Sequence, residues 1–208
     1  MTGNVADRAE LERFLRRAAR GLLEREITDR ESLALWTYLD LIASWNRVHR
    51  LVGSVETAWL VENVILDSLL FSRILPGWVR TVADIGSGVG VPGIPLGVVR
   101  PDLDIALIEA RRRRASFLAT AVRELGLTNC RVLGERAESA PGKYDAALAR
   151  CAGRPESTLR TARRLVRSGG AVVVSGAPDP EPVAGISWAR VEGWRPGTAR
   201  TLGTHIRE

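Results

Sequence analysis

From Arg80 onward, short apolar and β-branched runs alternate with segments of helical periodicity, and this alternation limits the folds open to the chain more than any other feature. The runs are TVADIG, DIALIEA, CRVLGE, YDAALAR and AVVVSG, which begin at residues 81, 104, 130, 144 and 171. Strands joined by helices in this way form a parallel sheet with helices on both faces. The sequence therefore predicts an α/β fold with a doubly wound, mostly parallel sheet.

The segments on either side of this alternation have their own patterns. Apolar spacing predicts helices over about residues 10–26, 29–49 and 57–75, with Thr28 or Asp29 as a cap and Pro76 as a stop. The tail, WARVEGW followed by ARTLGTHIRE, predicts two further strands in an antiparallel hairpin at a sheet edge. We expect a single domain of seven strands, with a helical extension over 1–78 and the α/β core over 79–208.

Composition excludes several classes of protein. The chain has 208 residues and no apolar stretch near the length of a membrane span. The acidic start MTGNVADRAELERF does not fit a secretory or transit peptide, so we expect a cytoplasmic protein without a membrane partner. The cysteines Cys130 and Cys151 form no CxxC pair, and there are only two histidines, so no metal site is expected.

The charge balance has two interpretations. The formal net charge is +6, and Lys143 is the only lysine, so nearly all positive charge is arginine. Such a balance fits an anionic partner such as nucleic acid, because phosphate contacts dominate that kind of binding. It also fits a GC-rich genome that encodes arginine wherever a cation is needed, and composition alone favours this second interpretation.

A glycine-rich turn follows the first predicted strand. The segment Asp84–Pro95 reads DIGSGVGVPGIP, in which Gly86, Gly88 and Gly90 give a GxGxG spacing. Glycines let a backbone approach a ligand closely, and the helix that follows offers free amides. Val91 stands where the dinucleotide fingerprint GxGxxG would want a glycine, which disfavours NAD.

An acid follows the second strand at Glu109, where a carboxylate can accept hydrogen bonds from ribose hydroxyls. The glycine turn and the acid together indicate a nucleoside site at the carboxyl ends of the strands. S-adenosylmethionine is the nucleoside most often bound by such a pattern, and it has no phosphate to cradle.

The segment GSGVGVPGIPLGVVRP carries a more specific resemblance. Together with Trp45-Asn46, the Leu66-Asp67-Ser68 segment, Arg136-Ala137-Glu138 and Ala149-Arg150, it resembles the RsmG (GidB) family across essentially the whole chain. That family consists of bacterial class I (Rossmann-like) methyltransferases that modify N7 of a guanine in 16S ribosomal RNA. The resemblance implies S-adenosylmethionine as cofactor and ribosomal RNA or the small ribosomal subunit as partner.

The resemblance also implies roles for individual residues. Gly86, Gly88, Gly90 and Val91 would wrap the methionine part of the cofactor, and Glu109 would hold the ribose. Ala137 and Glu138 would lie beside the adenine, and Arg150 would face both the cofactor and the substrate as the candidate catalytic residue.

Several family positions are changed in this chain. The family's W-N-x-x-x-N-L-T appears with His49-Arg50-Leu51-Val52 at its end, and Asn63 stands near the histidine of H-x-x-D-S. The Lys-Gly after the fifth strand is Ser175-Gly176 here. These changes leave cofactor binding intact and place the RNA substrate in question.

Two hypotheses about mechanism follow. Guanine N7 has a lone pair and no proton near neutral pH, so its methylation needs positioning and not a general base. We expect Arg150 and the loop Cys151–Arg154 to orient the target base, while Arg111–Arg114 and arginines of the N-terminal helices meet phosphates.

Three other functions are also compatible with the fold that the sequence predicts. A related enzyme that methylates a small molecule is the main alternative, supported by the changed positions. A non-catalytic module that binds RNA or a protein partner is less consistent with the glycine turn and Glu109, and an NAD-dependent enzyme is less consistent with Val91.

Overall fold

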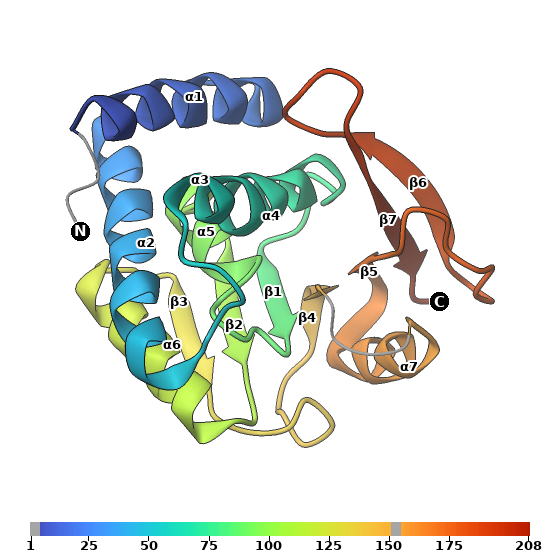
Figure 1. Cartoon of the computed structure of the whole chain (residues 1–208). Coiled ribbons are helices and arrows are strands. Elements are labelled where there is room, and N and C mark those ends of the chain that lie inside the picture. Colours follow the sequence, from blue (N-terminus) through green and yellow to red (C-terminus); the bar gives the residue numbers. More distant parts are fainter. Residues whose placement is uncertain (1–4, 151–154) are drawn as a thin grey trace.

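The computed structural model describes residues 5–150 and 155–208, and within these residues seven strands form one sheet in the order β3-β2-β1-β4-β5-β7-β6 (Figure 1). The strands are β1 (Thr81–Ile85), β2 (Asp104–Ile108), β3 (Cys130–Leu133), β4 (Tyr144–Ala149), β5 (Val166–Ser175), β6 (Ser187–Glu192) and β7 (Ala199–Ile206). Strands β1 to β5 are parallel, and β7 lies antiparallel between β5 and β6. The mostly parallel α/β sheet and the antiparallel edge hairpin are confirmed.

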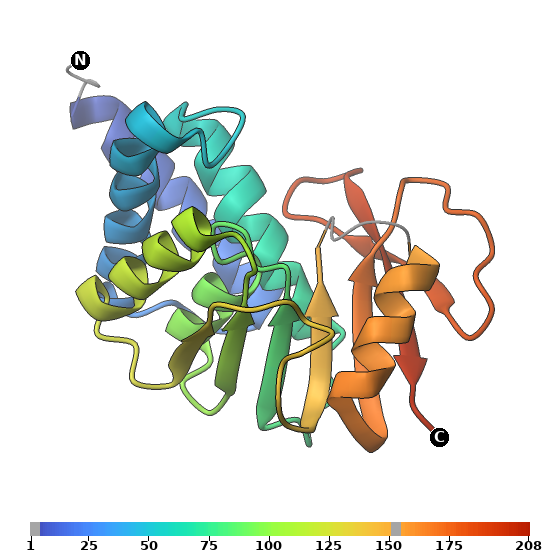
Figure 2. The same cartoon turned by 90° about the horizontal axis from the view of Figure 1, so that it is seen from below.

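The helices cover the two faces unequally. They are α1 (Val5–Leu23), α2 (Asp29–His49), α3 (Thr57–Leu60), η1 (Val61–Leu66), α4 (Asp67–Leu69), η2 (Leu70–Arg73), α5 (Gly93–Val99), α6 (Arg112–Glu124) and α7 (Pro155–Leu165). The elements from α1 to η2, with α5 and α6, share one apolar cluster with Val82 and Ile105 of the sheet. Helix α7 packs on the other face, against β5 and β4, and shares a second apolar cluster with Ala83 and Ile85 of β1 (Figure 2).

Helix α2 begins where the sequence predicts. The Thr28 hydroxyl accepts the N–H of Glu31 at 3.1 Å, and the Glu31 carboxylate accepts the N–H of Thr28 at 2.7 Å. This reciprocal capping box satisfies two backbone donors that the first turn leaves free. Helix α2 ends at His49, and Arg50 takes a left-handed conformation with φ of 45°.

The segment expected to be one regular helix over residues 57–75 differs from that expectation. It is α-helical in α3 and α4, but η1 between them is a π-helix and η2 is a 3-10 helix that ends at Arg73. Apolar spacing cannot detect a π turn, because one extra residue in the backbone ladder leaves the apolar face nearly continuous. All four pieces nevertheless bury side chains in the core.

The boundary between α7 and β5 also differs from expectation. The spacing of the sequence predicts a helix over about residues 155–167, but the observed helix ends at Leu165, and β5 starts at Val166 opposite Tyr144. Val166 is fully buried, and a β-branched side chain packs well in a strand. Gly169, with φ of +74°, allows the backbone to bend inside β5 before the regular pairing starts at Ala171.

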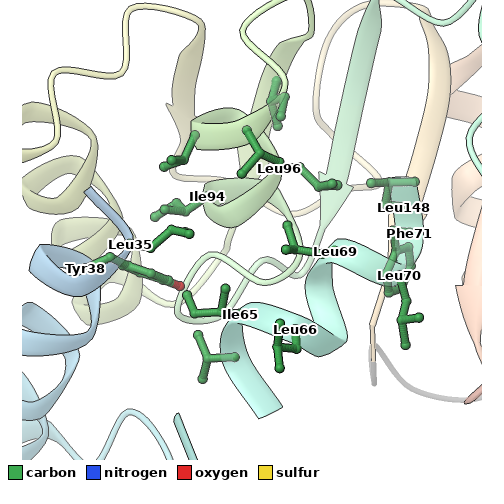
Figure 3. Close-up of a cluster of buried hydrophobic side chains, with 14 of the residues drawn as sticks. Leu35, Tyr38, Ile65, Leu66, Leu69, Leu70, Phe71, Ile94, Leu96 and Leu148 are labelled. Atoms are coloured by element: carbon green, nitrogen blue, oxygen red, sulfur yellow. The ribbon is translucent and has the colours of Figure 1, made fainter. Parts of the chain in front are cut away.

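The core between the N-terminal helices and the sheet reaches the glycine turn. Figure 3 shows Leu35 and Tyr38 of α2 facing Ile65 and Ile94, which come from η1 and α5. All four side chains are completely buried, so α2 is packed against the helix that follows the glycine turn. In the described part of the chain, no helix has the length and apolar character needed to cross a membrane.

Candidate functional site

The carboxyl ends of β1, β2 and β4 bring the predicted site together. Strand β1 lies between the other two, with Ile85 opposite Ile108 and Asp84 opposite Leu148. Chain order changes direction across β1 and β4, and ligands bind at such a switch point in open α/β sheets. The residues just beyond these strands, Gly86, Glu109 and Arg150, therefore lie on one edge of the sheet.

The glycine turn needs its glycines for two different reasons. Gly86, Gly88 and Gly90 all have positive φ, at 65°, 61° and 97°. An added Cβ at Gly88 would lie 3.8 Å from Arg114 Nη1 and from the Gly86 carbonyl, at ordinary contact distances, so the positive φ is what favours glycine there. At Gly93 a Cβ would lie 2.3 Å from Leu107 and 2.7 Å from Asp84, which only glycine avoids.

Glu109 ties this turn to helix α6. One carboxylate oxygen accepts the N–H of Gly88 at 3.0 Å, and the other accepts the N–H of Arg111 at 2.7 Å. The residue is 5% exposed, so its position is fixed. A carboxylate has about four lone-pair sites, so both oxygens keep capacity for ribose hydroxyls.

Asp84 is a completely buried acid at the end of β1. One oxygen accepts the N–H of Gly93 at 3.0 Å, and the other has no partner in the described part of the protein. Burial raises the pKa of Asp84 to about 7, while its bond from Gly93 opposes that rise. This second oxygen is a buried acceptor in the turn to which no described protein group donates a hydrogen bond.

Asp84→Asn is expected to change the pH dependence of stability. The carboxyl binds its proton more tightly in the folded chain than in the unfolded one, so the free energy of unfolding falls as pH rises from about 4 to about 7. The variant retains an amide oxygen for Gly93 and removes that titration. Thermal midpoints at about pH 5 and about pH 8 should therefore differ less in the variant. An equal difference in both proteins would contradict the assignment.

Tyr38 connects α2 to the glycine turn by a hydrogen bond. Its hydroxyl donates to the carbonyl of Val89 at 2.6 Å, and the ring is completely buried. Burial, with the nearby Asp84, raises the pKa of Tyr38 well above its usual value, whereas Arg150 acts in the opposite direction. The Tyr38 hydroxyl is therefore a neutral donor that holds the turn in place.

Arg150 lies just beyond β4, with its Nε paired and its Nη1 without a partner among the described residues. Its Nε is 3.1 Å from a carboxylate oxygen of Asp67, and the side chains are 17% and 13% exposed. Its Nη1 is buried and has no partner in residues 5–150 and 155–208. A buried, unpaired guanidinium N–H is costly, and a bound ligand would satisfy it.

The other predicted residues have less direct placements. Val91 is half-buried, and its N–H donates to the Ser87 carbonyl at 3.0 Å inside the turn. Ala137 packs against the apolar cluster under α7, and the exposed Glu138 accepts a bond from Thr161 of α7 at 3.3 Å. The adenine role of Ala137 and Glu138 stays a prediction, and the loop Cys151–Arg154 lies outside the described residues.

Comparisons with known proteins identify the family of the chain. Residues 31–179 match the family model GidB, described as rRNA small subunit methyltransferase G. The chain belongs to this family. A GidB relative from Xanthomonas campestris pv. campestris (strain B100), named ribosomal RNA small subunit methyltransferase G, is 32% identical over 187 residues, 88% of this chain and 85% of the relative. One from Laribacter hongkongensis with the same name is 36% identical over 142 residues, 67% of this chain and 68% of the relative.

Solved structures agree on the fold. A SAM dependent methyltransferase from Aquifex aeolicus aligns with a TM-score of 0.53 at 18% identity, covering 74% of this chain and 94% of that one. A mutant of MtNAS in complex with S-adenosylmethionine aligns with a TM-score of 0.55 at 14% identity, covering 98% of this chain and 90% of that one. As a GidB member with the class I methyltransferase fold, the chain is an enzyme whose methyl donor is S-adenosylmethionine.

Three residues of the site had no assigned role in the sequence-based prediction. Asp84 stands in the glycine motif, and Asp67 stands in the Leu66-Asp67-Ser68 segment, so both were visible as motif members. Tyr38 gave no signal beyond its place on an apolar helix face. Its contact with Val89 joins parts of the chain far apart in sequence, which periodicity cannot show.

Proposed function

We propose that this GidB-family enzyme methylates N7 of a guanine in 16S ribosomal RNA. The observation that carries the proposal is Arg150, a half-buried arginine whose buried Nη1 has no partner among the described residues, beside a glycine turn that Glu109 holds in place. The names of the GidB relatives, rRNA small subunit methyltransferase G, support RNA of the small subunit as substrate.

The residues present fit S-adenosylmethionine. The methionine part would lie beside the side-chain-free backbone of Gly86, Gly88 and Gly90, and the remaining lone pairs of Glu109 would accept the ribose hydroxyls. S-adenosylmethionine supplies a methyl group bound to a positively charged sulfur. The small-molecule alternative has no support from the relatives, which are named for ribosomal RNA.

The chain's own part in this reaction is positioning. Guanine N7 presents a lone pair near neutral pH, so no side chain has to remove a proton. Orienting two reactants in a site closed to water can contribute roughly 7–11 kcal/mol to lowering a barrier. We assign the orientation of the base to Arg150, whose Nη1 can donate to an acceptor on the guanine.

The start of α6 provides a second contact with RNA. Arg111, Arg112 and Arg113 are exposed, Arg114 is half-buried, and the helix has no side-chain cap. Positive charge at a helix N-terminus opposes the helix dipole, so these arginines gain little from their own helix. Their position next to Glu109 suits them to the phosphates that flank the target guanine.

The test uses labelled S-adenosylmethionine with small ribosomal subunits from a strain that lacks the endogenous enzyme. Label is expected in 16S RNA, at one guanine that becomes sensitive to the chain cleavage specific for 7-methylguanosine. A metabolite extract is the parallel substrate. Label in small molecules and not in RNA would replace the proposed substrate, and no label in either would contradict the proposal.

A further inference from the structure

The π-helix η1 places two acids on one side of the N-terminal helical layer. The N–H of Asp67 donates to the carbonyl of Glu62, five residues earlier, which is the bond that defines a π turn. An α-helix, at about 3.6 residues per turn, would direct residues five apart to different faces. The wider turn instead lets Glu62 and Asp67 reach the same neighbouring element.

That element is the hairpin of β6 and β7. The Glu62 carboxylate pairs with Arg195 and accepts the indole N–H of Trp194 at 3.4 Å. The Asp67 carboxylate accepts the Nε–H of Arg200 at 2.5 Å, and the Arg200 guanidinium lies 5.4 Å from the centre of the Trp194 ring. Both acids therefore fasten the same hairpin to the helical layer.

Only one of the two acids also reaches the active site. Asp67 gives one oxygen to Arg200 and the other to the Nε of Arg150, at 3.1 Å. Glu62 bonds to the hairpin at both of its oxygens. Glu62 therefore holds the hairpin alone, whereas Asp67 holds the hairpin and also contacts Arg150. Substitutions at the two acids can distinguish the loss of a hairpin contact from the loss of the contact with Arg150.

We propose that Asp67 is a positioning residue that sets the orientation of the Arg150 guanidinium, and that Arg200 fixes Asp67 in turn. The inference rests on the proposed function, because Arg150 is the group assigned to the target base. Arginine side chains have many rotamers, and the half-buried Asp67 carboxylate, bound at both oxygens, selects one of them. The hairpin at the end of the chain thereby supports the catalytic residue through one shared carboxylate.

Asp67→Asn tests the inference, with Glu62→Gln as its matched control. The first variant should lower kcat about 100-fold, the size expected when a reacting group is misplaced by about 1 Å. The dissociation constant of S-adenosylmethionine should stay within about threefold, because Asp67 contacts Arg150 and not the glycine turn. Glu62→Gln should destabilise the protein to a similar degree while kcat stays within about twofold.

Arg200→Gln is the second variant. It tests whether Asp67 orients Arg150 even if Asp67→Asn does not fold. The Arg200 side chain is 46% exposed, so its replacement should be tolerated in the fold. We expect kcat to fall about tenfold, with little further loss when the change is combined with Asp67→Asn, because coupled residues are not additive.

The outcomes separate the inference from the proposed function. Equal loss of kcat in Asp67→Asn and Glu62→Gln would show that hairpin docking alone matters, and would overturn the inference. Unchanged kcat in both Asp67→Asn and Arg200→Gln would overturn it as well. A wild-type enzyme that leaves ribosomal RNA unmethylated would refute the proposed substrate instead.

Discussion

Replacing Arg150 by alanine is expected to abolish methyl transfer while the fold is retained. The change removes the guanidinium whose buried Nη1 we assign to the target base. Loss of one preorganised donor in an active site typically lowers kcat by about 100- to 1,000-fold. Asp67 keeps Arg200 as a partner after the change, so its carboxylate is not left unpaired. Single-turnover methylation of small subunits and a thermal midpoint measure the two parts of the prediction.

Arg167→Ala is the matched control for this change. Arg167 pairs with Asp145 at 2.7 Å, near the start of β4, whereas Arg150 follows the end of the same strand. Each substitution removes the arginine of an arginine–aspartate pair, one near the start of β4 and one just past its end, but only Arg150 lies at the carboxyl edge of the sheet. We expect Arg167→Ala to keep wild-type turnover. Wild-type turnover in Arg150→Ala would remove that residue from the mechanism.

Glu109→Ala is expected to weaken binding of S-adenosylmethionine by about 100-fold or more. Hydrogen bonds to a charged group contribute about 1.5–3 kcal/mol each, so losing two ribose contacts corresponds to at least about 3 kcal/mol. The change also frees the N–H groups of Gly88 and Arg111, which the carboxylate holds in the free protein. Titration calorimetry with the cofactor measures the effect directly.

Two further variants serve as comparisons for the cofactor affinity of Glu109→Ala. Glu109→Gln retains one oxygen acceptor and should fall between wild type and alanine. Glu124→Ala removes a surface acid near the other end of α6, where Glu124 pairs with Arg123, and should leave the affinity unchanged. An affinity of Glu109→Ala close to that of wild type would mean that another group holds the ribose.

The parts of the site that the sequence predicts are those encoded within one short segment. Gly86, Gly88 and Gly90 stand in a motif whose spacing requires positive φ, and the structure has it at all three. Glu109 follows the strand next to β1, so the expected register of parallel strands brings it to the turn. Local rules of this kind act over a few residues and can be recognised in a single chain.

The parts that the sequence does not predict depend on contacts between distant segments. The pairing of Arg150 with Asp67, and of Asp67 with Arg200, joins β4, the N-terminal helices and β7. These side chains become neighbours only after the sheet order and the packing of η1 are established. The π turn itself is invisible to apolar periodicity, although it determines which acids face the hairpin.

The hydrogen bond from Tyr38 to Val89 has a consequence for attempts to reduce this enzyme to a minimal core. A fragment that starts at residue 79 contains the whole glycine motif and Glu109. It lacks the hydroxyl that satisfies the Val89 carbonyl, and it exposes Ile94, which α2 and η1 cover in the full chain. We therefore do not expect the glycine motif to keep its conformation when it is separated from α2, because a residue about fifty positions earlier holds part of the turn in place.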